Sequence, residues 1–125
     1  MNMANQAQSK IPNGKVCYIQ IPATDIAVSV SFYQKVFGWN IRTRSDGSIA
    51  FDDAEYGVSG TWVLNRKPHT DSGLLIYMMV DDVAATLEMI VANGGKIVEP
   101  MSGKAPEFIA TFSDPAGNLF GIGQE

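Results

Sequence analysis

The sequence has few of the side chains on which most enzyme chemistry depends, with one cysteine, Cys17, and one histidine, His69, among 125 residues. A single cysteine cannot form an internal disulfide. Cys17 lies in an apolar, alternating stretch, so we expect it to be buried as a small hydrophobic side chain. His69 lies two residues before Asp71, a carboxylate that would polarise the imidazole of a general base. No candidate nucleophile stands beside His69, so we interpret it as part of a solvated linker.

Basic residues and long apolar runs are also scarce. Nine Lys and Arg against 13 Asp and Glu give a net charge of −4 and a pI of about 4.8. The chain therefore lacks the positive field that binds nucleic acid or an anionic membrane surface. The longest apolar runs, such as 73–80, are too short to cross a bilayer, and residues 1–10 lack the apolar block of a secretory signal. These absences favour a cytoplasmic protein with neither a nucleic-acid nor a membrane partner.

What the chain does contain is enough apolar material for one globular domain, and a repeat. Apolar residues make up 46% of the sequence and charged residues 18%. A shift of 57 positions places Asp25 on Asp82 and Gly38 on Gly95, and the positions between them agree in side-chain class more than in identity. The repeat predicts two copies of one unit, over 15–64 and 73–125. We expect an unstructured tail over 1–14 and a linker over 65–72.

The first unit reads as a strand, a helix and three strands. Residues 16–21 alternate, with Cys17, Ile19 and Ile21 expected on the core side. Thr24 or Asp25 can cap a helix that Gly38 ends. The expected apolar stripe of this helix comprises Ile26, Val30, Tyr33 and Phe37. Strands follow over 39–43, 48–53 and 58–64, with a hairpin signal at 46–47 and a loop over 53–57. Asp52, Asp53 and Glu55 form a carboxylate cluster that could serve a metal or acid-base chemistry, but we interpret them as solvated turn formers.

The second unit repeats this order and gives an α+β fold of two βαβββ modules. A strand is predicted over 74–80, then a helix capped by Asp81 or Asp82 and ended by the 94–95 glycine pair. The expected apolar stripe of this helix comprises Val83, Leu87, Ile90 and Val91. Strands follow over 96–99, 107–112 and 118–121. The segment 101–106 between the first two has the composition of a flexible lid or of a long hairpin loop.

Alternation along the strands also predicts where a ligand binds. Each helix must cover one face of its sheet, which leaves the other, concave face free to enclose a cleft with its counterpart. The residues expected on that free face are Tyr18, Gln20, Leu75, Tyr77 and Met79. Trp62 has an ambiguous position in its strand, and we include it as a possible aromatic wall. This set is typical of a site for a small organic molecule held by apolar and aromatic contacts.

Four motifs resemble one known superfamily. They are Ile21–Asp25, Phe32–Trp39, Asn93–Lys96 and Asp114–Phe120, and they occur in order across nearly the whole chain. The pattern is similar to the vicinal oxygen chelate superfamily, which contains glyoxalases, bleomycin-resistance proteins and extradiol dioxygenases. The resemblance implies paired βαβββ modules and commonly a homodimer with the site at the module interface.

The resemblance also implies where a catalytic metal would be bound. Its ligands would stand at Tyr18, at Leu75, at Gly121 and close to Leu64. Three of these positions carry no donor atom in a side chain, whereas a Zn, Ni or Fe site needs about three or four N, O or S ligands. We therefore expect no metal and no other cofactor.

Three hypotheses for function follow. The first is a metal-free, dimeric protein that binds a small organic molecule, with bleomycin-resistance proteins as the nearest analogy. The second is a lyase, epimerase or dioxygenase with a relocated metal site that uses Gln20, His69 or Glu107. The third is a fold used only for association with another protein. The missing ligands and the apolar free faces favour the first.

Overall fold

A computed structural model describes residues 11–71 and 73–125, and in them the predicted order of elements occurs twice. The first module contains β1 (Tyr18–Pro22), α1 (Ile26–Phe37), β2 (Asn40–Thr43), β3 (Ile49–Asp52) and β4 (Ser59–Val63). The second contains β5 (Tyr77–Met79), α2 (Val83–Ala92), β6 (Lys96–Lys104), β7 (Glu107–Ser113) and β8 (Leu119–Gln124). The α+β prediction of two βαβββ modules is confirmed.

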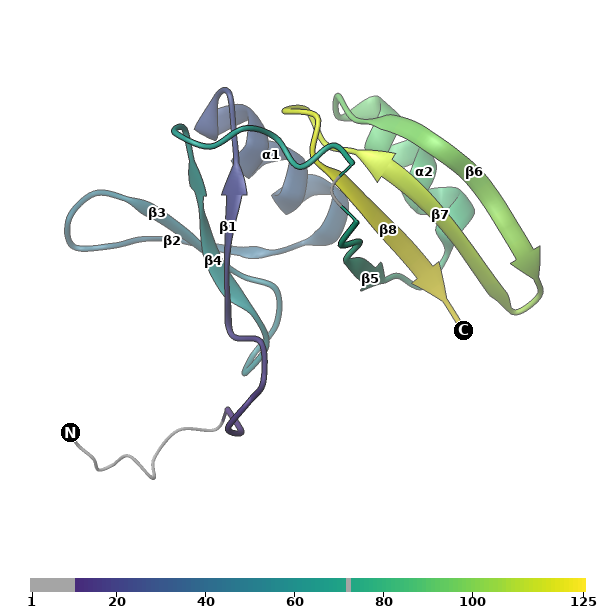
Figure 1. The fold of residues 1–125 in the computed structure, drawn as a ribbon, viewed down its shortest axis with the longest axis horizontal. Coiled ribbons are helices and arrows are strands. Elements are labelled where there is room, and N and C mark those ends of the chain that lie inside the picture. Colours follow the sequence, from purple (N-terminus) through teal and green to yellow (C-terminus); the bar gives the residue numbers. More distant parts are fainter. Residues whose placement is uncertain (1–10, 72) are drawn as a thin grey trace.

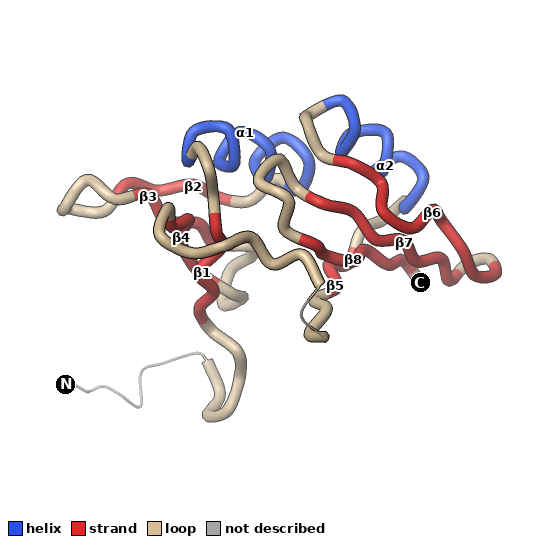
Figure 2. Tube along the Cα trace, turned by 45° about the horizontal axis from the view of Figure 1, so that its top comes forward, coloured by secondary structure: helices blue, strands red, loops and turns tan. Residues whose placement is uncertain are grey.

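Each module forms its own four-stranded mixed sheet. The strand orders are β1-β4-β3-β2 in sheet A and β5-β8-β7-β6 in sheet B, with β1 parallel to β4 and β5 parallel to β8 (Figure 1). The first strand of each module is therefore an edge strand. Both helices lie along one side of the molecule, which leaves the other face of each sheet uncovered by a helix (Figure 2). We call these uncovered faces the open face of sheet A and the open face of sheet B.

The helix boundaries follow the predicted caps. The Asp25 carboxylate accepts the N–H of Val28 at 3.3 Å, and Asp82 does the same for Ala85 at 3.0 Å. Gly38 ends α1 with a left-handed backbone, φ 70°, a conformation that costs glycine little. None of the helices in the described residues is long and apolar enough to traverse a lipid bilayer.

The two modules share one hydrophobic core, and aromatic rings from α1 join its halves. The Phe32 ring lies 6.1 Å from that of Phe112 in β7, and the Tyr33 ring meets Phe120 of β8 edge-on at 6.3 Å. Both α1 residues are fully buried. Because α1 contributes side chains to both sheets, the relative position of the modules is fixed by packing.

Three details of the predicted core are wrong. Phe32 is buried although it was not placed in the apolar stripe of α1, because that stripe faces a second module as well as its own sheet. Val91 is exposed, since the buried residues of α2 are Val83, Leu87 and Ile90. Cys17 is also exposed, because β1 begins only at Tyr18 and the preceding residue projects beyond the packed part of the sheet.

The segment 101–106 is neither a lid nor a long loop. Strand β6 continues to Lys104 and β7 begins at Glu107, so a two-residue turn joins a long antiparallel pair. Residues 1–10 of the expected tail and residue 72 of the expected linker lie outside the described residues.

Candidate functional site

A cleft of about 400 Å³ lies between the two modules. The first module contributes Ile19 and Ile21 of β1, with Phe37, Trp39 and Phe51 behind them, and the loop residues Asp53, Ala54 and Val58. The second module contributes β5 with the residue before it, and Phe120 of β8. β1 and β5 are edge strands of the two separate sheets, and residues of both line the cleft. The cleft therefore lies between the edges of the two sheets. Its volume is within the range of sites for small organic molecules.

The wall of the cleft is a rigid aromatic stack. Trp39 is 9% exposed, and its ring stacks on Phe51 at 4.5 Å and on Tyr33 at 4.6 Å, with interplanar angles of 20° and 16°. Phe37 adds a tilted contact with Trp39 at 6.1 Å. Phe51 is fully buried and both faces of Trp39 are covered by other rings, so the stack presents mainly ring edges to a ligand, in positions already fixed by folding.

Asp53 is the acidic residue among the described residues that line the cleft, and its carboxylate is hydrogen-bonded within a loop. The Asp53 carboxylate accepts the N–H of Val58 at 2.6 Å, and its backbone N–H donates to the Val58 carbonyl at 2.9 Å. These bonds close the loop between β3 and β4. With its carboxylate so engaged, we assign Asp53 a structural part in the site.

Tyr77 forms the rim of the cleft on the second module. Its side chain is 49% exposed, and its ring lies over Gly121 of the neighbouring strand β8. A Cβ atom at position 121 would come within 2.6 Å of the ring carbons, well inside van der Waals contact. Glycine at this position therefore lets the Tyr77 ring rest against the backbone, with its edge available to a ligand.

The predicted site residues do not all come together. Tyr77 and Met79 line the main cleft. Gln20 lines a smaller cavity of about 150 Å³, next to His69. Leu75 is half-buried just before β5. Tyr18 lies on the open face of sheet A, because successive residues of β1 face opposite sides and Ile19 faces the cleft.

Trp62 is placed in the core. It is 3% exposed and packs 4.9 Å from Phe51 and 5.8 Å from Tyr33, so it lies behind the aromatic wall. Its indole N–H is buried and has no hydrogen-bond partner within the described residues. The wall residues Phe37, Trp39 and Phe51 were not predicted, since alternation assigns them to the core and carries no signal for a cleft at a sheet edge.

The positions that the resemblance assigns to a metal do not suit one. The register pairs Gln20 with Thr61 just as it pairs Tyr77 with Gly121, so Thr61, and not Leu64, is the counterpart of Gly121. The 57-residue repeat does not extend to this strand. The corrected set of Tyr18, Thr61, Leu75 and Gly121 offers only two neutral hydroxyls, which is a poor donor set for a transition metal. Within residues 11–71 and 73–125, no three His, Cys, Asp or Glu side chains are grouped as metal ligands.

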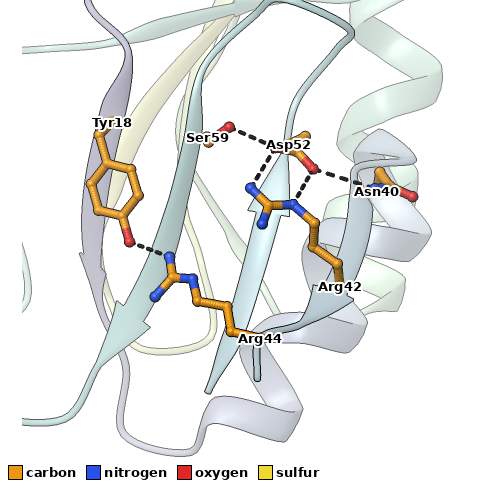
Figure 3. A network of polar contacts seen from close by, with 6 residues as sticks. All are labelled: Tyr18, Asn40, Arg42, Arg44, Asp52 and Ser59. Carbon is orange, nitrogen blue, oxygen red and sulfur yellow. Dashed lines mark hydrogen bonds and ion pairs between the residues drawn. The ribbon is translucent and has the colours of Figure 1, made fainter. Parts of the chain in front are cut away.

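The open face of sheet A carries a polar network instead (Figure 3). Arg42 donates two hydrogen bonds to Asp52, at 2.8 and 3.1 Å, and Ser59 and Asn40 donate to the same carboxylate. The Arg42 bonds, followed by that of Ser59, hold the pKa of Asp52 well below its usual range. Asp52, read from the sequence as a solvated turn former, is thus a fixed ion-pair partner. Farther along the face, Arg44 reaches the Tyr18 hydroxyl.

Comparison with known proteins identifies the family. Residues 15–122 match the Glyoxalase/Bleomycin resistance protein/Dioxygenase superfamily, and the chain belongs to it. A glyoxylase-like domain-containing protein from Didymella fabae is 29% identical over 120 residues, which cover 88% of this chain and 93% of that protein. The anthracycline biosynthesis protein DnrV from Streptomyces peucetius is 24% identical over 127 residues. That match covers 87% of this chain but only 46% of DnrV, so the chain spans about half of its length.

Solved structures share the fold at low identity. Hypothetical protein SA1046 from S. aureus has a TM-score of 0.72 at 15% identity, over 90% of this chain and 94% of that one. A superfamily enzyme from Burkholderia phytofirmans PsJN has a TM-score of 0.71 at 19% identity, over 89% and 98%. TioX from Micromonospora sp. ML1 has a TM-score of 0.64 at 20% identity, over 89% and 98%. At these identities the likeness establishes the fold alone.

Proposed function

We propose that the protein binds a small, flat organic molecule in the cleft between its modules and does so without a metal. The observation that carries this proposal is the stacked wall of Trp39, Phe51 and Phe37 on one side of the cleft, opposite Tyr77 and Met79. An aromatic ligand in the cleft exchanges water for apolar contact with the edges of these rings and with Tyr77 and Met79. The donor set at the metal positions argues in the same direction.

The name of one relative supports a ligand of this shape. DnrV is described as an anthracycline biosynthesis protein, and anthracyclines are planar, fused-ring molecules. A hydroxyanthraquinone is therefore a suitable probe for the cleft. Binding without turnover is part of the proposal, as in bleomycin-resistance proteins.

The proposed binder is a homodimer. The open face of sheet B carries exposed apolar side chains outside the cleft, of which Ile109 lies beside the bare backbone of Gly123. A second copy of the chain would cover these side chains. Ile109→Glu should shift the sedimentation coefficient to that of a monomer, whereas Val91→Glu on the exposed side of α2 should not.

The competing hypothesis is an enzyme with a relocated metal site, and one observation favours it. Gln20 and His69 border the same small cavity. The third candidate, Glu107, begins β7 and pairs with Lys104 across the hairpin. A thermal-shift series with Zn, Ni, Mn and Fe tests this hypothesis, because any metal held by the folded state raises its stability. A rise of several degrees that Gln20→Ala or His69→Ala abolishes would replace the metal-free proposal.

The cleft itself is tested with fluorinated tryptophan. The chain has two tryptophans, one in the wall of the cleft and one behind it, so protein labelled with 5-fluorotryptophan gives two ¹⁹F resonances. Trp62→Phe assigns them. Titration with a hydroxyanthraquinone should move the Trp39 resonance strongly and the Trp62 resonance little, because a ring-current shift falls steeply with distance. Equal shifts, or none at millimolar probe, would refute binding in the cleft.

A further inference from the structure

Arg44 crosses the open face of sheet A to reach Tyr18. Arg44 follows β2, which is one edge of the sheet, whereas Tyr18 begins β1, the other edge. The Arg44 guanidinium donates a hydrogen bond to the Tyr18 hydroxyl and lies 5.7 Å from the centre of the Tyr18 ring (Figure 3). The arginine side chain therefore spans the two intervening strands, a path that loses much rotamer freedom and needs a compensating interaction.

Within residues 11–71 and 73–125, Arg44 forms no salt bridge, although its charge, after the hydrogen bonds from Ser48, contributes to lowering the pKa of the nearby Asp46 carboxyl. Arg42 forms a salt bridge with Asp52, so the charges of these two neighbours of Arg44 compensate each other. The carboxylate nearest along the chain, Asp46, is taken up by Ser48, whose N–H and hydroxyl donate to it at 2.9 and 2.7 Å. Arg44 in turn contacts the Ser48 hydroxyl at 3.4 Å. The guanidinium of Arg44 thus lies on this face without a carboxylate hydrogen-bonded to it, in a protein whose net charge is −4.

The Tyr18 hydroxyl can still donate a hydrogen bond to a ligand. It accepts from Arg44, and no hydrogen bond that it donates is found among the described residues. The side chain is 45% exposed, so a ligand can reach it. Beside it, the hydroxyl of Thr61 and the amide of Gln20 belong to one row of the same face, since β1 and β4 pair these two residues. The Thr61 hydroxyl donates to the Ile49 carbonyl at 2.5 Å, so the row adds neutral polar side chains to the face that also carries Arg44.

We propose that Arg44 and Tyr18 form a binding site for the carboxylate of a small aromatic acid. A guanidinium N–H and a phenol O–H converge on the two oxygens of such a group, and Arg is suited to carboxylates by its planar set of donors. The exposed edge of the Tyr18 ring meets the aromatic part of the ligand. This site does not depend on the cleft, because Tyr18 and Ile19 face opposite sides of β1.

Matched probes separate the two sites. 2-Naphthoate and 2-naphthamide share one aromatic body and differ in charge. We expect naphthoate to bind at least about tenfold more tightly and to shift the side-chain Nε–Hε resonance of Arg44, one of three arginines in the chain. A probe that enters the cleft instead moves the fluorinated Trp39. Failure at one site is thereby distinguished from failure at the other.

Substitutions then assign the preference. Arg44→Met should abolish the advantage of naphthoate over naphthamide, and Tyr18→Phe should reduce it severalfold. Lys35→Met removes the same charge from the exposed end of α1 and should leave the preference unchanged. If Arg44→Met lowers the melting temperature too far, Arg44→Lys keeps the charge and should retain part of the preference. Equal affinity for the two probes, or equal losses in Arg44→Met and Lys35→Met, overturns the proposal.

Discussion

The Tyr33 hydroxyl donates a hydrogen bond of 2.6 Å to the Asp114 carboxylate, and this bond joins the helix of one module to the last turn of the other. Asp114 also accepts from the backbone N–H groups of Ala116 and Asn118, and from the Asn118 amide. Asn118 donates in addition to the Pro22 carbonyl at the end of β1. Asp114 and Asn118 of the second module thus hold α1 and the end of β1 in the first module.

We expect Tyr33→Phe to destabilise the protein by about 1 to 3 kcal/mol. The substitution keeps the ring and its packing but removes one donor to a buried carboxylate, and a hydrogen bond to a charged group is worth about that much. Urea denaturation of both proteins measures the difference. Tyr77→Phe, which alters a half-exposed phenol on β5, is the matched control and should cost much less. Equal losses of unfolding free energy in the two variants would show that the Tyr33–Asp114 hydrogen bond does not stabilise the protein.

The same bond predicts a dependence on alkaline pH. Burial, with the negative charge of Asp114 and the hydrogen bond to it, raises the pKa of Tyr33 well above 10.0. A raised pKa in the folded state means that the stabilisation is complete below pH 10 and declines as the pH rises above it. Stability measured from pH 9 to 11.5 should fall more steeply in the natural protein than in Tyr33→Phe. Parallel curves would contradict this assignment.

Acid should act through a different ion pair. The pKa of Asp52 is lowered in the folded state, first by Arg42, so the stabilisation is present above the ordinary value of 3.8 and is lost as the pH falls below it. Asp52→Asn should therefore flatten the loss of stability between about pH 4 and pH 2. Because the pair is partly exposed, the effect should shrink in high salt. Thermal unfolding across this range measures it, and Asp71→Asn in the linker serves as the control.

The sequence was a better guide to the fold than to the site, for a physical reason. Caps at Asp25 and Asp82 and the stop at Gly38 are local signals, and they placed the helices correctly. The cleft depends on how far apart two sheet edges lie, a distance that no local pattern encodes. Residues such as Trp39 belong to the core and also border the cleft, and no local sequence pattern separates these two parts. The reach of Arg44 across a sheet is likewise invisible until the strand order is known.

Tyr77 and Gly121 provide the sharpest test of the rim of the cleft. Gly121→Ala would place a Cβ within 2.6 Å of the ring, so Tyr77 must move away, at a cost of about 1 to 3 kcal/mol if the strands adjust as well. Gly123→Ala lies two residues along the same face and meets its nearest neighbour, Ile109, at 3.7 Å, an ordinary contact. It is therefore the matched control.

Ligand affinity should follow the position of the Tyr77 ring. We expect Tyr77→Ala to weaken binding of a hydroxyanthraquinone about tenfold while the melting temperature stays within a few degrees, because the side chain is half exposed. Gly121→Ala should weaken binding to a similar extent, and Gly123→Ala should not. Calorimetric titration of the three variants measures this order. A large loss of stability in Tyr77→Ala would mean that the ring supports the fold, and full affinity in both Tyr77→Ala and Gly121→Ala would remove Tyr77 from the site.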